Sequence, residues 1–97
     1  MELLMSSSLI RALSSAQLRA ARALLRWSAE DLARASSVGL TTIRRAELAE
    51  GATSLTTAND LALRRSLEAA GVEFIDENGG GPGVRLRGRE TSKKKNR

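Results

Sequence analysis

The feature that most constrains the fold of this chain is a pair of short helical segments separated by only three residues. Ser28 and Asp31 have the spacing of a capping box, in which each side chain accepts a hydrogen bond from the other residue's backbone N–H. Trp27 and Leu32 flank this box with the spacing of a hydrophobic staple, which fixes the angle at which the chain enters a helix. The pattern therefore predicts a short helix over residues 29–36.

A second helix is predicted directly after this one. Residues 37–39 read Ser-Val-Gly, which suits a tight turn, and residues 40–50 suit a helix that ends at Gly51. Two helices joined by a three-residue turn that contains glycine make the sequence pattern of a helix-turn-helix. Val38 and Ile43 are predicted to face inward. The outward side chains of the second helix are predicted to be Leu40, Thr41, Arg44, Arg45 and Leu48.

Two further helices are predicted on either side of this pair, over residues 15–26 and 58–70. Their candidate N-caps are Ser14 or Ser15 for the first and Thr56 or Thr57 for the second. Apolar side chains recur along both at three- and four-residue steps, which indicates a packed face. The side chains expected on these faces are Leu18, Ala21, Leu24 and Leu25 in the first and Leu61, Leu63, Leu67 and Ala70 in the second.

The chain changes its hydrophobic period after Gly71. Residues 72–75 and 84–87 alternate apolar and polar side chains at least in part, and residues 76–83 between them are rich in glycine. This pattern predicts an antiparallel hairpin. Because an isolated two-stranded hairpin is marginally stable, we expect it to pack on the helices or to pair across a dimer.

These patterns divide the chain into one small folded unit and its flanks. We expect the helical domain over residues 15–76, followed by the glycine-rich loop and second hairpin strand over residues 77–89. Residues 1–14 are assigned to an N-terminal extension and residues 90–97 to a basic tail. The expected fold class is therefore mainly all-α, with a C-terminal β-hairpin.

The net charge of +5 is distributed unevenly along the chain. Between residues 15 and 76, eight arginines are matched by eight acidic residues, so the predicted helical domain is neutral. The excess lies after Gly83, where seven basic residues are opposed only by Glu90. A tail of this kind either attracts nucleic-acid phosphate over a long range or serves as a solubilising terminus.

The residue types that are absent exclude several kinds of chemistry. The chain has no cysteine and no histidine, so we expect no disulfide, no thiol or imidazole catalysis, no metal site and no cofactor. No apolar run approaches the ~18–20 residues that span a bilayer, and the first residues lack the pattern of a secretory signal. We therefore expect a cytoplasmic protein that is not an enzyme and has no membrane partner.

Residues 27–51, WSAEDLARASSVGLTTIRRAELAEG, resemble the Cro/C1-type (XRE) helix-turn-helix family of bacterial and phage regulators. The likeness lies in the pattern of Leu32, Ala33, Val38 and Ile43, and it extends into the flanking segments. It implies a lambda-repressor-like bundle of four to five helices. It also implies a homodimer on a two-fold-symmetric operator, with the third helix of the domain in the major groove of double-stranded DNA.

The resemblance also implies roles for particular side chains. The positions that read bases or line the groove are occupied by Leu40, Thr41, Arg44 and Arg45. Ser28 and Thr42 stand where phosphate contacts are made, and Arg22 and Glu47 stand where some members form a structural ion pair between the first and third helices. For the two arginines at the groove to act, their guanidinium groups must point outward and remain free of the chain's own acids.

A second function is compatible with the same fold. Ala29 stands where the family commonly has a glutamine that clamps DNA, Ser37 where glycine often relieves the turn, and Leu40 where a polar residue is frequent. Leu48 adds a further apolar side chain to the predicted outer face, which suits a helix-in-groove contact with a protein. The alternative function is therefore a protein-binding antiactivator that sequesters another transcription regulator.

Overall fold

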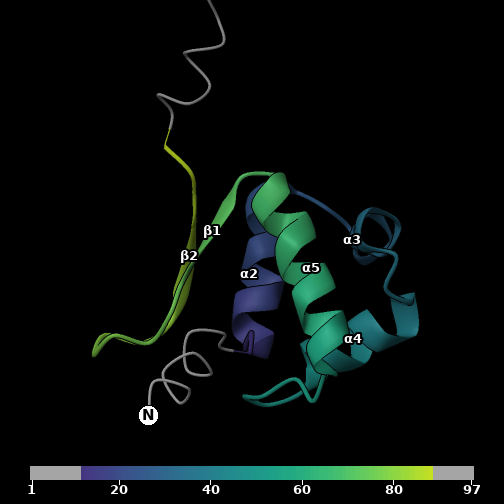
Figure 1. Ribbon diagram of the computed structural model, residues 1–97, viewed down its shortest axis with the longest axis horizontal. Coiled ribbons are helices and arrows are strands. Elements are labelled where there is room, and N and C mark those ends of the chain that lie inside the picture. Colours follow the sequence, from purple (N-terminus) through teal and green to yellow (C-terminus); the bar gives the residue numbers. More distant parts are fainter. Residues whose placement is uncertain (1–11, 89–97) are drawn as a thin grey trace, which may run out of the picture.

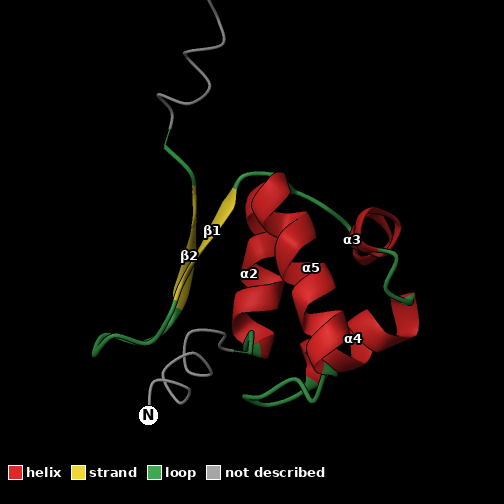
Figure 2. Ribbon diagram, in the orientation of Figure 1, coloured by secondary structure: helices red, strands yellow, loops and turns green. Residues whose placement is uncertain are grey.

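The computed structural model describes residues 12–88 of the chain, and within that range the fold is mainly helical (Figure 1). The helices are α2 (Ser15–Leu25), α3 (Ala29–Ser36), α4 (Leu40–Leu48) and α5 (Thr57–Ala69), and the strands are β1 (Val72–Ile75) and β2 (Gly83–Leu86). Figure 2 shows the helices gathered beside an antiparallel hairpin. The expected class, mainly helical with a C-terminal hairpin, is confirmed. Residues 1–11 of the expected extension and the tail over residues 90–97 lie outside the described residues.

Helix beginnings follow the local sequence closely. At α3, the Ser28 hydroxyl accepts from the N–H of Asp31 at 3.0 Å, and the Asp31 carboxylate accepts from the N–H of Ser28 at 2.8 Å, as the spacing predicts. At α2, the cap is Ser14, and the side chain of Gln17 accepts from its N–H at 3.0 Å, which makes a second capping box. At α5, the cap is Thr56. None of these helices is long and apolar enough to cross a membrane.

The turn between α3 and α4 depends on a left-handed residue. Ser37 has φ 64°, and its N–H donates to the carbonyl of Ala33 at 2.8 Å, which ends α3. Val38 then points into the core, and Gly39 caps α4 without a side-chain hydrogen bond. A residue with a Cβ atom is strained at this φ, so the tight turn forms against a local conformational preference.

Helix α4 ends at Leu48, so the predicted end at Glu50 with Gly51 as its cap is wrong. The chain leaves the helix because α2 binds the carbonyl groups that follow. The hydroxyl of Ser15 donates to the carbonyl of Ala49 at 2.7 Å, and the N–H of Ser15 donates to the carbonyl of Gly51 at 3.0 Å. These hydrogen bonds fix the end of α4 against the start of α2.

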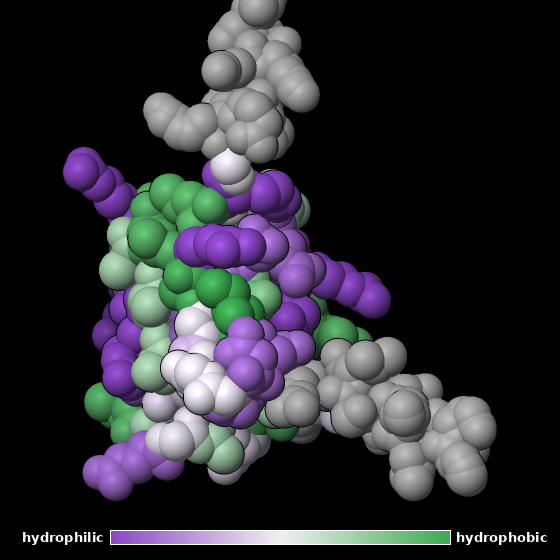
Figure 3. Space-filling view, turned by 90° about the vertical axis from the view of Figure 1, so that its left-hand side faces the viewer, coloured by the Kyte–Doolittle hydropathy of each residue, from purple (hydrophilic) through white to green (hydrophobic). Residues whose placement is uncertain are grey.

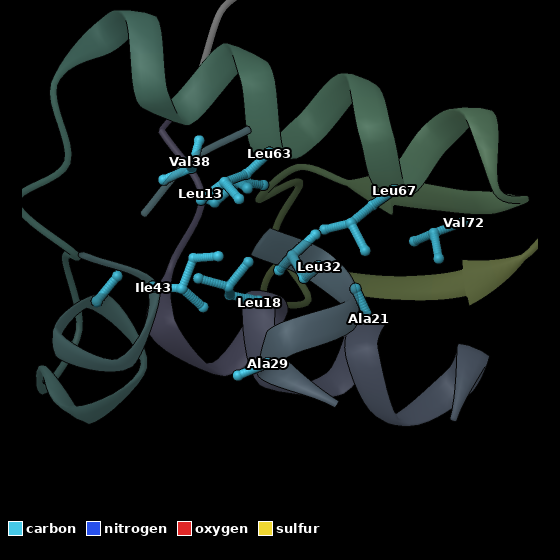
Figure 4. Close-up of a cluster of buried hydrophobic side chains, with 11 residues drawn as sticks. Leu13, Leu18, Ala21, Ala29, Leu32, Val38, Ile43, Leu63, Leu67 and Val72 are labelled. Carbon is cyan, nitrogen blue, oxygen red and sulfur yellow. The ribbon is translucent and has the colours of Figure 1, made fainter. Parts of the chain in front are cut away.

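The hydrophobic core lies between the helices and the inner face of the hairpin (Figure 4). Its buried apolar side chains are Leu13, Leu18, Ala21, Ala29, Leu32, Val38, Ile43, Ala46, Leu63, Leu67 and Val72. Four side chains predicted to be inside are not fully covered, and one of them, Leu25, is half-buried against the core. Leu24 is 38% exposed and Ala70 is exposed, because they lie in or past the last turn of their helices. Leu61 is half-buried, since it stands one residue away from the packed face of α5.

The chain before α2 belongs to this core. Leu13 is buried, although it falls within the expected N-terminal extension. Its N–H donates to the carboxylate of Asp60 on α5 at 3.1 Å, and Asp60 is itself buried. This contact joins segments 47 residues apart in the sequence, so the start of the described chain is held against the beginning of α5.

One amide side chain ties the hairpin to α2. Gln17 is buried, and its Nε2 donates to the carbonyls of Ile75 at 3.2 Å and Gly83 at 3.1 Å, which face each other across the two strands. The second strand begins at Gly83, one residue earlier than predicted. On the outer face, Glu73 and Arg85 form an ion pair at 3.1 Å. The hairpin thus packs on the helices, as its marginal intrinsic stability requires.

Candidate nucleic-acid interface

Helix α4 presents one face to the core and another to solvent. Ile43, Ala46 and Glu47 are buried on the inner face. The exposed side chains are Thr41, Arg44, Arg45 and Leu48, as the periodicity predicts. Figure 1 shows α4 at the edge of the molecule, next to the turn that leads from α3. The helix therefore offers its outer face to a partner while its inner face is fully occupied.

The beginning of α4 is less exposed than expected. Leu40 is half-buried and packs against the core, so its predicted outward orientation is wrong. The reason is helical spacing, because Leu40, Ile43 and Glu47 recur at three- and four-residue steps and so share one side of the helix. Thr42 is half-buried as well. The side chains available on the outer face are accordingly more polar than the sequence suggests.

Two arginines of α2 hold a single residue of α4. The Arg22 guanidinium donates from Nε and Nη2 to the two carboxylate oxygens of Glu47, at 2.7 and 2.8 Å, and from Nη1 to the carbonyl of Trp27 at 2.8 Å. Arg19 donates to the backbone carbonyl of Glu47 at 2.6 Å. The hydrogen bonds with Glu47 raise the pKa of Arg22, although partial burial acts in the opposite direction. This network, which includes the expected Arg22–Glu47 contact, sets the orientation of α4.

The two outer arginines of α4 differ in their surroundings. Arg44 donates from Nη2 to the carboxylate of Glu30 at 2.9 Å, and both side chains are about half exposed, at 55% and 51%. This contact departs from the expectation that both guanidinium groups remain free of the chain's acids. Arg45 is exposed and forms no ion pair within residues 12–88. One of the two candidate base-reading arginines is thus available, and the other is engaged at the surface.

Arg45 also borders a groove of about 520 Å³ between the end of α4 and the beginning of α5. Its walls include Thr42, Leu48, Leu55 and Asn59. Leu48 is 82% exposed, which makes it the most exposed large apolar side chain in the described part of the chain. The sequence shows these residues but not the groove, because its walls come from segments that meet only in the folded chain.

Ser28 and Glu30 lie in the first turn of α3, near the same outer face. The Ser28 hydroxyl caps the helix by accepting from the N–H of Asp31, and the serine itself is exposed. The sequence assigns Glu30 only a stabilising role at the helix N-terminus. Its contact with Arg44 was missed because it spans 14 residues and depends on the angle between α3 and α4.

Comparison with known proteins adds no further information about this site. No protein-family model matches the chain, and no curated protein matches its sequence.

Proposed function

We propose that this chain is a cytoplasmic, sequence-specific DNA-binding transcription regulator, in which α3, the turn and α4 form a helix-turn-helix and α4 enters the major groove. The observation that carries the proposal is the division of α4 into two faces. Its inner face is locked to α2 through the paired Arg22 and Glu47, while its outer face carries Arg44 and Arg45. The resemblance of residues 27–51 to the Cro/C1-type family supports the same function.

The chemistry of the outer face suits a DNA ligand. The guanidinium group of arginine donates in a fork that matches the two acceptors of a guanine edge, and threonine at position 41 suits a thymine methyl group. A helix is narrow enough to enter the major groove with these side chains foremost. Ser28 and Thr42, at the starts of α3 and α4, are the proposed phosphate contacts that set the register.

We further propose that the regulator is a homodimer that pairs through the hairpin. The N–H of Arg87 donates to the carbonyl of Gly71. In an antiparallel pair, every second residue of a strand forms hydrogen bonds with its partner strand. The backbone N–H and carbonyl groups of Val84 and Leu86 therefore point away from β1. No other strand of the described chain pairs with this edge. Leu86 is 48% exposed, and Figure 3 shows apolar surface on this face of the molecule. A second copy would cover both the edge and the apolar side chains.

A protein-binding function is the second candidate, and one observation favours it. Leu48 projects from α4 next to the groove that Leu55 lines, which is an arrangement that accommodates an apolar side chain of a partner helix. In this case the chain is an antiactivator that binds another transcription regulator. Leu48→Asp then releases that regulator in a pull-down. Leu48→Gln, which adds no charge beside Arg45, is expected to release it as well, whereas it leaves operator binding by a DNA reader largely intact.

A gel shift with DNA from the region upstream of the protein's own gene tests the main proposal. We expect a discrete complex that survives an excess of random-sequence duplex and weakens as the salt concentration rises, because phosphate contacts release condensed cations. Absence of any complex at low salt, together with capture of a regulator that Leu48→Asp abolishes, would establish the antiactivator in its place.

A further inference from the structure

We propose that Glu30 is an autoinhibitory residue, which restrains Arg44 through their ion pair and thereby lowers the affinity of the chain for DNA. The inference rests on the proposed function, since it assigns a regulatory role to a residue beside the same site. Its basis is the position of the Glu30 carboxylate, 2.9 Å from the guanidinium group of Arg44 on the outer face of α4.

The Glu30 carboxylate lies in the first turn of its own helix, and its surroundings favour the charged form. A hydrogen bond with the backbone N–H of Glu30 lowers its pKa most, and the positive charge of Arg44 and the hydroxyl of Ser28 lower it further. The carboxylate is therefore ionised at neutral pH and occupies the positive end of α3, where an anion such as a DNA phosphate is otherwise favoured.

Glu30 is not needed to begin the helix. The neighbouring Asp31 closes the capping box with Ser28 and also pairs with Arg34 at 2.5 Å. Removing the charge of Glu30 consequently leaves these contacts of α3 in place. The role of Glu30 can be tested without disrupting the fold on which α4 depends.

The Glu30–Arg44 contact is of the kind that a DNA ligand can displace. It is a single hydrogen-bonded contact between half-exposed side chains, in contrast to the two-point contact between Arg22 and the buried Glu47. A guanine edge or a phosphate offers two acceptors to the same guanidinium group. DNA therefore competes with Glu30 for Arg44, and the competition reduces affinity without abolishing it.

The strength of an exposed ion pair sets the size of the effect. Such a pair changes an equilibrium constant by up to about fivefold. Two copies bound to one operator each release the restraint, so the effects multiply to about 25-fold for a dimer. Loss of a carboxylate near the phosphates also makes binding more salt-dependent.

The experiment compares full-length variants by fluorescence anisotropy with the upstream duplex and with a random-sequence duplex of the same length. Glu30→Gln is expected to tighten binding by up to about 25-fold for the dimer and to steepen the salt dependence. Asp76→Asn is the matched control, because it removes one negative charge from an exposed acid of the hairpin loop that forms no ion pair within residues 12–88. The control is expected to change affinity much less.

A double-mutant cycle establishes whether Glu30 acts through Arg44. In the Arg44→Ala background, Glu30→Gln is expected to lose most of its effect. Two results would overturn the inference and leave the proposed function standing. In the first, the wild-type chain binds the duplex, and Glu30→Gln increases its affinity no more than Asp76→Asn does. In the second, Glu30→Gln increases the affinity equally in the Arg44→Ala background. If neither the wild-type chain nor Glu30→Gln binds either duplex, both the function and the inference fail.

Discussion

At the scale of single residues, Ser37 shows how local strain supports the candidate site. Its left-handed backbone allows α3 and α4 to meet after a three-residue turn, and the contact between Glu30 and Arg44 follows from that meeting. Serine lacks the conformational freedom of glycine at this φ. The turn geometry is thus maintained by the packing of its neighbours, including the buried Val38.

Replacing Ser37 by glycine is expected to stabilise the fold by about 1 kcal/mol, because glycine adopts positive φ without a steric penalty. Urea unfolding followed by circular dichroism measures the change. Ala35→Gly is the matched control, since Ala35 is an exposed residue inside α3. A glycine at that helical position is expected to destabilise the fold by about 0.5–1 kcal/mol. Equal effects of the two variants would show that the φ of Ser37 is not strained.

At the scale of elements, the capping box of α3 couples stability to pH. Hydrogen bonds from the backbone and hydroxyl of Ser28 lower the pKa of Asp31, and the charge of Arg34 lowers it further. A carboxyl whose folded pKa lies below its unfolded value stabilises the fold above the ordinary aspartate pKa of about 4. That stabilisation is lost as the pH falls through the lowered folded value.

We expect the thermal midpoint of the wild-type chain to fall on the acid side of about pH 4, and Asp31→Asn to weaken this dependence. Thermal melts over a series of pH values provide the measurement. Asp76→Asn is a suitable comparison, because Asp76 is exposed and takes no part in the caps of α2, α3 or α5. If the thermal midpoints of wild type and Asp31→Asn fall equally as the pH is lowered below about 4, the role assigned to the capping box is contradicted.

The contact between α2 and α4 makes a second prediction at this scale. Glu47→Gln leaves the partly buried guanidinium group of Arg22 without its counter-charge, and we expect a loss of about 2–3 kcal/mol in the free energy of unfolding. The double variant Arg22→Met/Glu47→Leu removes both charges and is expected to recover much of that loss. If the double variant is as unstable as Glu47→Gln, the destabilisation does not come from an unpaired charge.

The elements themselves were largely predictable from the sequence, because their signals are local. The capping box at Ser28, the turn over residues 37–39 and the change of period after Gly71 each lie within a few residues, and each matches the fold. The end of α4 was not predictable, since it depends on hydrogen bonds from Ser15, more than 30 residues earlier. The same reason explains why the contact of Gln17 with the hairpin and that of Glu30 with Arg44 were missed.

At the scale of the whole molecule, the proposed dimer can be examined separately from DNA binding. Leu86→Asp places a charge at the free edge of β2 and is expected to shift the chain from dimer to monomer in analytical ultracentrifugation. Leu48→Asp, which alters an exposed leucine on α4, is the matched control and is expected to leave the dimer intact. Retention of the dimer by Leu86→Asp would place the interface elsewhere.

The site as a whole was only partly predictable. Helical periodicity located Arg44 and Arg45 on the outer face of α4. Leu40 was also predicted there, but it shares the side of Ile43 and Glu47, and the core covers it in part. Periodicity reports the direction of a side chain from its own helix and contains no information about neighbouring helices. The groove beside Leu48 and the engagement of Arg44 by Glu30 both depend on such neighbours.

The most direct test of DNA recognition by α4 compares two double variants that each remove two positive charges. Arg44→Ala/Arg45→Ala alters α4, and Arg26→Ala/Arg65→Ala alters exposed arginines elsewhere that form no ion pair within residues 12–88. We expect the α4 variant to lose specific binding to the upstream duplex with a nearly unchanged melting curve, and the control to keep it. Retained binding by the α4 variant, or equal losses in both, would contradict DNA recognition by α4.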